Sequence, residues 1–153
     1  MRIVVAADNA GVELKNQLRD LLRADARVAE VTDLGVPDAS DERPYPDLGL
    51  AAAETVARGE ADRGVLVCGT GIGVAISANK VPGVRAAVVH DSYSAERSVK
   101  SNDCQIITFG ARVIGAELAK KIVGEWLDYR FDPESASATK VARITEYERA
   151  HGA

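Results

Sequence analysis

The chain has 153 residues, which is enough for one domain with a sizeable core, and we expect a single domain over residues 1–153. Hydrophobic residues make up 46% of the sequence, but no apolar run reaches the roughly 20 residues that a membrane-spanning helix needs, so we expect no membrane partner. The formal net charge of −4 argues against a nucleic-acid-binding surface.

The beginning of the sequence and its two cysteines indicate the compartment. Met1 leads directly into an apolar, strand-like segment with no targeting sequence, and this favours the cytoplasm. Cys68 and Cys104 are expected to be free thiols there, because disulfides rarely persist in a reducing compartment. Neither cysteine belongs to a C-x-x-C pair, so the sequence predicts no metal site.

Five short aliphatic segments are typical of buried strands, and segments with apolar residues at helical spacing separate them. In the first helical segment, Leu14 and Leu18 lie on the apolar face, and Lys15 is expected to face outward. The expected strands cover residues 2–7, 28–33, 64–67, 84–89 and 105–109. The expected helices cover residues 12–23, 48–58, 73–79, 92–100, 115–127 and 134–149.

Strands that alternate with helices in this way predict a parallel sheet covered on both faces. Right-handed crossovers then give a doubly wound, Rossmann-like α-β-α sandwich with a five-stranded parallel sheet. Ligands of such folds bind beyond the carboxyl ends of the strands. The polar segments expected at those ends are Asp8-Asn9, Asp33, Cys68-Gly69, His90-Asp91 and Gly110–Arg112.

A glycine-rich segment, Cys68-Gly69-Thr70-Gly71-Ile72-Gly73, joins the third strand to the following helix. Glycines at alternate positions let a ligand or another backbone approach closely. The start of a helix presents unpaired N–H groups that attract anions. Cys68 would lie at the edge of this positive site, where thiols ionise readily. We interpret the segment as a reactive thiolate beside an anion-binding turn.

Simpler interpretations of this segment remain open. The G-x-G-x-x-G dinucleotide fingerprint would need a glycine where Val74 stands, so nucleotide binding is the weaker hypothesis. Cys68 could be an inert buried thiol, and Cys104, which lacks a glycine turn, is interpreted as structural.

Polar residues near other strand ends also have two interpretations. Asp8 could bind substrate or only cap the following helix. His90 could take part in chemistry or only bond to a backbone group. Arg112 suits a phosphate, because a guanidinium at the edge of a pocket matches phosphate oxygens. Lys140, near the start of the last helix, could supply a second phosphate contact.

A set of motifs spans nearly the whole chain: Ile3–Asp8 with Gly11 and Lys15, Tyr45-Pro46, Cys68–Gly73, Ala78–Lys80, Gly83–Arg85, Tyr93–Ala95, Asn102 and Phe109–Gly115. Together they resemble the ribose-5-phosphate isomerase B and galactose-6-phosphate isomerase family. Its members interconvert phosphorylated aldoses and ketoses without a cofactor or metal. The resemblance therefore implies a small sugar phosphate as ligand, and a homodimer or homotetramer with active sites at the interface. The last helix, about residues 134–149, would pack on a partner subunit.

The resemblance also implies roles for single residues. Cys68 would be the base that moves a proton between C1 and C2 of a cis-enediolate, and Thr70 would assist proton transfer at the oxygens. The backbone N–H groups that would hold the oxyanion belong to Gly69, Gly71, Ile72 and Gly73. The positions that match sugar-binding residues are Asp8, Tyr45 and Asn102, and the position that matches a phosphate contact is Arg112.

Three features depart from the family pattern, two at single positions and one at a pair of positions. Asn9 stands where most members have histidine, and Ser101 stands where the family has its ring-opening histidine. Both remain candidate substrate contacts. Ala136 and Lys140 replace a basic pair, so only Lys140 is a candidate second phosphate contact.

The missing histidine suggests which sugar is used. Serine cannot shuttle a proton near neutral pH as histidine does, so a sugar that closes into a ring would react slowly. A tetrose 4-phosphate cannot form a furanose, and we expect D-erythrose 4-phosphate and D-erythrulose 4-phosphate to be preferred over the ribose 5-phosphate pair. His90 is the alternative source of an imidazole. The rival functions are an isomerase of a hexose phosphate or free aldose, and a non-catalytic nucleotide- or phosphate-binding module.

Overall fold

A five-stranded parallel sheet forms the centre of the structure, a computed structural model that describes residues 1–152. The strands are β1 (Arg2–Ala7), β2 (Glu30–Asp33), β3 (Arg63–Cys68), β4 (Ala86–Val88) and β5 (Ile106–Gly110). Their order in the sheet is β2-β1-β3-β5-β4, and every neighbouring pair is parallel. The doubly wound α-β-α architecture expected from the sequence is therefore confirmed.

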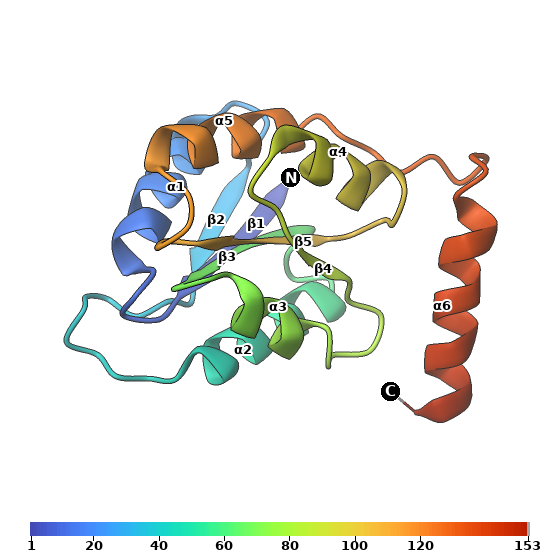
Figure 1. Ribbon diagram of the computed structural model, residues 1–153, viewed down its shortest axis with the longest axis horizontal. Coiled ribbons are helices and arrows are strands. Elements are labelled where there is room, and N and C mark those ends of the chain that lie inside the picture. Colours follow the sequence, from blue (N-terminus) through green and yellow to red (C-terminus); the bar gives the residue numbers. More distant parts are fainter. Residues whose placement is uncertain (153) are drawn as a thin grey trace.

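Helices cover both faces of the sheet (Figure 1). α1, α4 and α5 lie on one face, and α2 and α3 pack against each other on the opposite face. The helices are α1 (Val12–Ala24), α2 (Tyr45–Ala57), α3 (Ile72–Ala78), α4 (Ser92–Lys100), α5 (Ala116–Trp126) and α6 (Ala138–His151). Among residues 1–152, none of these helices has both the length and the apolar character needed to cross a bilayer.

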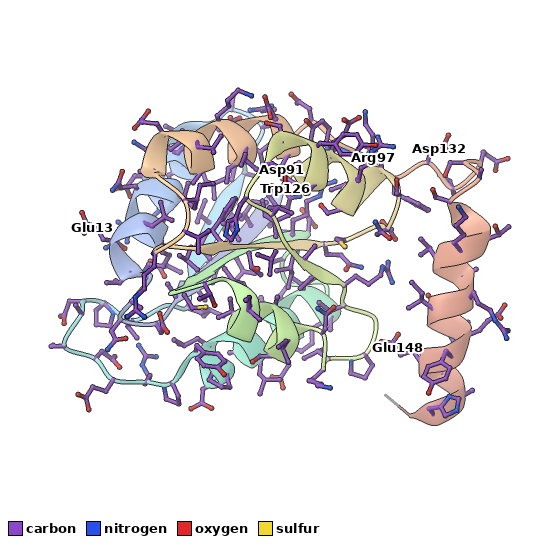
Figure 2. All side chains as sticks on the ribbon, viewed as in Figure 1. Glu13, Asp91, Arg97, Trp126, Asp132 and Glu148 are labelled. Atoms are coloured by element: carbon purple, nitrogen blue, oxygen red, sulfur yellow. The ribbon has the colours of Figure 1, made fainter. Side chains whose placement is uncertain are left out.

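The core has two layers, one on each face of the sheet. Val5 and Val65 contribute to the layer under α1, α4 and α5, where Trp126 is fully buried (Figure 2). Val4 and Leu66, their neighbours in sequence, contribute to the layer under α2 and α3. Successive strand residues point to opposite faces, so strands buried on both sides need the uninterrupted aliphatic runs seen in the sequence.

The first residues of two helices differ from the expected ones by three or four residues, and the other helix starts differ by at most one. α2 begins at Tyr45 rather than at residue 48, with Pro44 as its N-cap and Pro46 in its first turn. Proline is tolerated there because the first N–H groups of a helix have no intrahelical acceptor. α6 begins at Ala138 rather than at residue 134, because a turn in which the Ser135 N–H donates to the Asp132 carbonyl comes first.

The prediction that Lys15 faces outward was wrong. Its side chain is only 2% exposed, and Nζ donates to both oxygens of Asp33 at 2.9 and 2.8 Å and to the Val36 carbonyl at 3.2 Å. The long side chain reaches across the sheet edge to the end of β2, where a carboxylate compensates its charge. Asp33, one of the strand-end residues considered for a site, is therefore used within the fold.

α6 stands beside the sandwich rather than on one of its faces (Figure 1). It makes few contacts with the other helices and strands of the described chain, and only Val141 on it is buried. Ile144 and Tyr147 are 53% and 66% exposed. Glu148 lies on the side of α6 that faces the sandwich (Figure 2). This helix therefore carries apolar side chains that the chain itself leaves uncovered.

Candidate active site

A pocket of about 470 Å³ opens at the carboxyl ends of β1 and β3. The chain leaves β1 toward α1 on one face of the sheet and leaves β3 toward α3 on the other. A doubly wound sheet has its binding crevice where connections diverge in this way. The pocket is lined by Asp8, Asn9, Ala10, Tyr45, Cys68, Gly69, Thr70, Ile72, Gly73, Ile76 and Arg112.

Cys68 is the last residue of β3 and lines this pocket, although its side chain is only 4% exposed. The backbone N–H of Gly71 donates to its Sγ at 3.2 Å. Gly71 has φ of +78°, and a β-carbon built there would lie 2.8 Å from the carbonyl carbon of Phe109. Only glycine satisfies both conditions. The turn after β3 thus aims one backbone donor at a sulfur beside the pocket.

β5 and the segment after it hold this turn in place. The Thr108 hydroxyl donates to the Gly71 carbonyl at 2.8 Å, and the N–H of Arg112 donates to the Gly69 carbonyl at 3.0 Å. The guanidinium of Arg112 then folds against Gly69, where an added β-carbon would lie 3.3 Å from Nη1. A cationic side chain therefore lies beside the turn and lines the pocket that contains the thiol.

The amides expected to form an oxyanion site have different surroundings. The N–H of Ile72 donates to the hydroxyl of Thr70 at 3.3 Å, and that of Gly71 points to sulfur. Gly71 is buried and does not line the pocket, whereas Gly69, Ile72 and Gly73 do. The turn therefore combines a thiol, a hydroxyl and several backbone donors at one end of one strand.

Asp8 and Asn9 follow β1 and line the same pocket. Oδ1 of Asp8 accepts from the N–H groups of Ala10 and Gly11, both at 3.1 Å. The carboxylate therefore orders the turn before α1 and lines the pocket as well, but it does not cap the helix, whose N-cap is Gly11. Asn9 is exposed and Tyr45 is 41% exposed, so both present polar groups to a ligand.

Ser101 and Asn102 lie at the amino ends of the strands, whereas this pocket lies at the carboxyl ends. α4 starts at the carboxyl end of β4, so the chain that leaves it has returned to the amino ends of the strands. The side chain of Asn102 donates to the Arg97 carbonyl at 3.0 Å, and its own carbonyl accepts from Arg85, just before β4. The alternation of strands and helices expected from the sequence already implied that residues 101 and 102 lie at the amino ends of the strands, away from the pocket.

His90 and Lys140 do not line the pocket either. Nε2 of His90 accepts from the N–H of Gly110 at 2.9 Å, so the ring has a backbone partner at the end of β4. Lys140 is exposed in the first turn of α6. Within one chain, the pocket therefore receives neither an imidazole nor the lysine.

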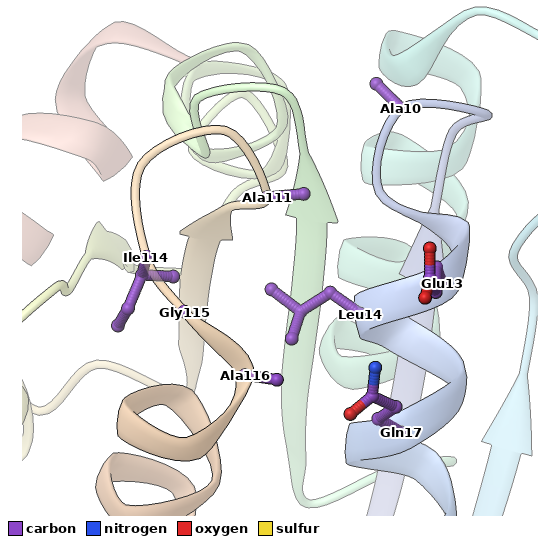
Figure 3. Close-up of a pocket in the computed structure, with 8 residues that line it drawn as sticks. All are labelled: Ala10, Glu13, Leu14, Gln17, Ala111, Ile114, Gly115 and Ala116. Atoms are coloured by element: carbon purple, nitrogen blue, oxygen red, sulfur yellow. The ribbon is translucent and has the colours of Figure 1, made fainter.

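A second hollow, of about 320 Å³, lies between α1 and the start of α5 (Figure 3). Leu14, Ile114 and small residues form most of its walls, and its polar side chains are those of Glu13 and Gln17 on α1. The carboxylate of Glu13 disfavours a phosphate there. An anionic ligand is therefore expected near Arg112 rather than in this hollow.

Sequence reasoning missed two residues that line the pocket, Ala10 and Ile76. Ile76 lies one turn after Ile72 on α3, and this spacing could have identified it. The second cysteine lies elsewhere: burial raises the pKa of the Cys104 thiol to about 11. Among residues 1–152, no group of three or more histidine, cysteine, aspartate or glutamate side chains could hold a metal ion.

Comparison with known proteins gives a consistent result. The family model described as Ribose/Galactose Isomerase matches residues 3–144. D-erythrulose-4-phosphate isomerase 2 of Mycolicibacterium smegmatis is 56% identical over 150 residues, which are 98% of this chain and 99% of that protein. D-erythrulose-4-phosphate isomerase of Pectobacterium atrosepticum is 47% identical, over 97% of this chain and 95% of its own. The solved structure of ribose-5-phosphate isomerase B from Clostridium thermocellum has a TM-score of 0.93 and 43% identity, and the match covers 99% of both chains.

Proposed function

Because this chain belongs to the ribose/galactose isomerase family, we propose that it interconverts a phosphorylated aldose and its ketose without a cofactor, as one isomerase domain. The placement of Cys68 supports this most directly. Its sulfur lies at the end of β3, beside the 470 Å³ pocket, and receives the N–H of Gly71. A hydrogen bond from an amide stabilises negative charge on sulfur, which is the form that removes a proton.

Proton transfer then follows from the residues around the sulfur. The Cys68 thiolate takes the proton from C2 of the aldose, and the electron pair moves onto the carbonyl oxygen to give a cis-enediolate. The thiol returns the proton to C1, while Thr70 helps to move a proton from one oxygen to the other. The backbone N–H groups of the pocket-lining residues of the turn, Gly69, Ile72 and Gly73, would stabilise the negative oxygen, while that of Gly71 stays with the sulfur. Removing one such donor in other enzymes costs about 2.7–4 kcal/mol.

The remaining pocket residues would hold the sugar phosphate. Arg112, folded against Gly69, would bind the phosphate as a charged, forked donor. Asp8 uses Oδ1 for its own turn, and its second oxygen would accept from a sugar hydroxyl. Asn9 and Tyr45 line the same pocket and would contact the remaining oxygens.

For the substrate, we favour D-erythrulose 4-phosphate and D-erythrose 4-phosphate. No imidazole lines the pocket of the described chain, and Ser101 occupies the family position of the ring-opening histidine. A tetrose 4-phosphate needs no ring opening, so the lack of a shuttle is harmless for it. Two relatives, at 56% and 47% identity, are named for D-erythrulose 4-phosphate. We place the activity in the cytoplasm, where reducing conditions would keep the thiols free.

A second copy of the chain would complete the site. Ser101 and Asn102 lie at the wrong edge of the sheet to reach the pocket of their own chain, and α6 carries Lys140 together with uncovered apolar residues. We therefore propose a homodimer, or a tetramer built from such dimers, in which α6 packs on the partner subunit. Asn102, Ser101 and Lys140 would then contact a substrate bound in the partner's pocket.

The test is Cys68→Ala, measured on tetrose, pentose and hexose phosphates. The alanine variant should lose about 10²–10⁴-fold in kcat and still bind the sugar phosphate. Cys104→Ala is the matched control, because it removes the other buried thiol away from the pocket, and it should keep near-normal turnover. Higher kcat/KM for ribose 5-phosphate than for erythrose 4-phosphate would contradict the tetrose assignment. Equal turnover by Cys68→Ala and the unmodified chain would contradict the mechanism.

A further inference from the structure

Tyr45 lines the pocket although it is far in sequence from the turn after β3. It is the first residue of α2, and its ring lies directly on the backbone of α3 at Gly73. A β-carbon built at position 73 would lie 2.6 Å from Cζ and 2.9 Å from Cδ2 of that ring. Contacts this short do not occur between real atoms, so any side chain at 73 would have to move the ring.

The backbone of Gly73 itself does not call for glycine. Gly73 is absent from the residues with positive φ and lies within α3, where alanine is a better helix former. The space that an alanine would fill is the space occupied by the Tyr45 ring. Glycine at 73 therefore serves the position of that ring.

The packing of α2 on α3 fixes the backbone position from which the Tyr45 side chain extends. One turn after Tyr45, a β-carbon at Gly49 would lie 3.1 Å from Cβ of Ser77, which is one turn after Gly73. The Ser77 hydroxyl also donates to the Gly73 carbonyl at 2.8 Å. The two helices are therefore held close at successive turns, and a clash at 73 would be relieved by the tyrosine ring, which is the free end of a side chain.

We propose that Gly73 is a positioning residue, which sets the width of the substrate pocket by giving the Tyr45 ring its place on α3. Gly73 acts through Tyr45 and touches the sugar with its backbone at most. The kinetic part of this inference rests on the proposed isomerase function; the structural part does not.

The experiment combines Gly73→Ala, Tyr45→Ala and the double variant. With ring-labelled tyrosine, the NMR signal of Tyr45 is assigned by its loss in Tyr45→Ala and should shift in Gly73→Ala. For the preferred sugar phosphate, Gly73→Ala should lower kcat/KM about tenfold, mainly through KM, in the chain that has Tyr45. In the Tyr45→Ala background, the same change should cost clearly less, because the ring that the new β-carbon would displace is absent.

Gly124→Ala is the matched control. Gly124 is also helical, in α5, and a β-carbon there meets nothing within 4 Å. This variant should raise Tm and leave the Tyr45 signal and kcat/KM unchanged. Gly73→Ala should raise Tm as much as Gly124→Ala does only in the chain that already carries Tyr45→Ala. This Tm measurement tests the placement of the ring even if Gly73→Ala alone fails to fold.

An unshifted Tyr45 signal in Gly73→Ala would overturn the inference, as would an equal loss of kcat/KM in both backgrounds. If the protein isomerises no phosphorylated sugar, the proposed function fails. The NMR signal and Tm still test the placement of the ring in that case.

Discussion

At the scale of single residues, the turn after β3 places two separate demands on Gly71. Its φ of +78° is costly for any residue with a β-carbon, and its close approach to Phe109 leaves no room for one. Its N–H is the donor to Cys68. One position therefore combines a left-handed backbone, close packing against β5 and the hydrogen bond to the sulfur.

Gly71→Ala and Gly83→Ala separate these demands. Gly83 has nearly the same φ, +81°, but a β-carbon there meets nothing within 4 Å. Gly83→Ala should lower the free energy of unfolding by about 1–2 kcal/mol, the cost of the left-handed backbone. Gly71→Ala should lower the free energy of unfolding by the same amount and by about 1–3 kcal/mol more, because of the clash with Phe109. The Gly71→Ala protein should also lose most of the isomerase activity. Urea unfolding measures both costs, and equal values would show that the contact with Phe109 is unimportant.

The sequence predicted which residues line the pocket better than it predicted the contacts between them. Cys68, Asp8 and Arg112 were predicted because strand ends and a glycine turn are local signals, whereas Tyr45 came only from the family resemblance; all four line the pocket. The contact between Tyr45 and Gly73 could not be found, because it depends on how closely α2 approaches α3. Side-chain distances across two helices leave no pattern along the chain.

At the scale of helices and strands, apolar periodicity located every element, and the errors came from charged or terminal residues. Lys15 was assigned to the solvent face because lysine is seldom buried without a partner. Its partner is Asp33, 18 residues away at the end of the next strand. An ion pair between two elements can therefore bury a charged residue that the pattern of its own helix assigns to solvent.

The Lys15–Asp33 pair makes stability depend on pH. Burial alone would raise the pKa of Asp33, but hydrogen bonds from Lys15, Gly35 and Arg19 outweigh it and hold the pKa below its ordinary value. The folded chain thus binds fewer protons at this site than the unfolded chain does. The stabilisation is complete above the unfolded pKa of about 4 and is lost as the pH falls through the folded value. Urea unfolding between neutral pH and pH 3 should show a smaller decline for Asp33→Asn than for the unmodified chain, and parallel curves would contradict this.

Removing Lys15 and removing Asp33 should lower the free energy of unfolding by different amounts. After Lys15→Met, Asp33 still accepts from Arg19 at 3.1 Å and from the N–H of Gly35 at 3.0 Å. After Asp33→Leu, Lys15 keeps only the Val36 carbonyl at 3.2 Å while remaining buried. An unpaired buried charge typically costs about 3–5 kcal/mol. We expect Asp33→Leu to reach that range and Lys15→Met to stay below it, with both measured by denaturant unfolding at neutral pH.

At the scale of the whole molecule, the chain leaves helix α6 largely uncovered and holds two predicted site residues away from its pocket. A 14-residue helix with little tertiary support is marginal in water. α6 also exposes Ile144 and Tyr147. The same chain holds Asn102 and Lys140 away from its own pocket. A symmetric dimer would resolve both features, because each copy would cover the α6 of the other and supply it with polar residues.

Mixing two inactive variants tests this arrangement. Cys68→Ala damages the pocket side of a site, and Asn102→Ala damages the side that a partner would supply. In a mixed dimer, one site then carries both lesions and the other carries none. Subunits dissociated and reassociated at equal amounts should recover about a quarter of the unmodified activity, since half of the dimers are mixed and half of their sites are intact.

The control mixture combines Cys68→Ala with Asp8→Ala. Both residues line the pocket of their own chain, so every site in a mixed dimer carries one lesion, and no activity should return. Recovery only in the first mixture requires that Asn102 act across the interface. Equal recovery in both mixtures would point to repair that is unrelated to shared sites. If neither mixture recovers although the subunits exchange, each chain works alone, and Asn102 serves only to end α4 through its bond to Arg97.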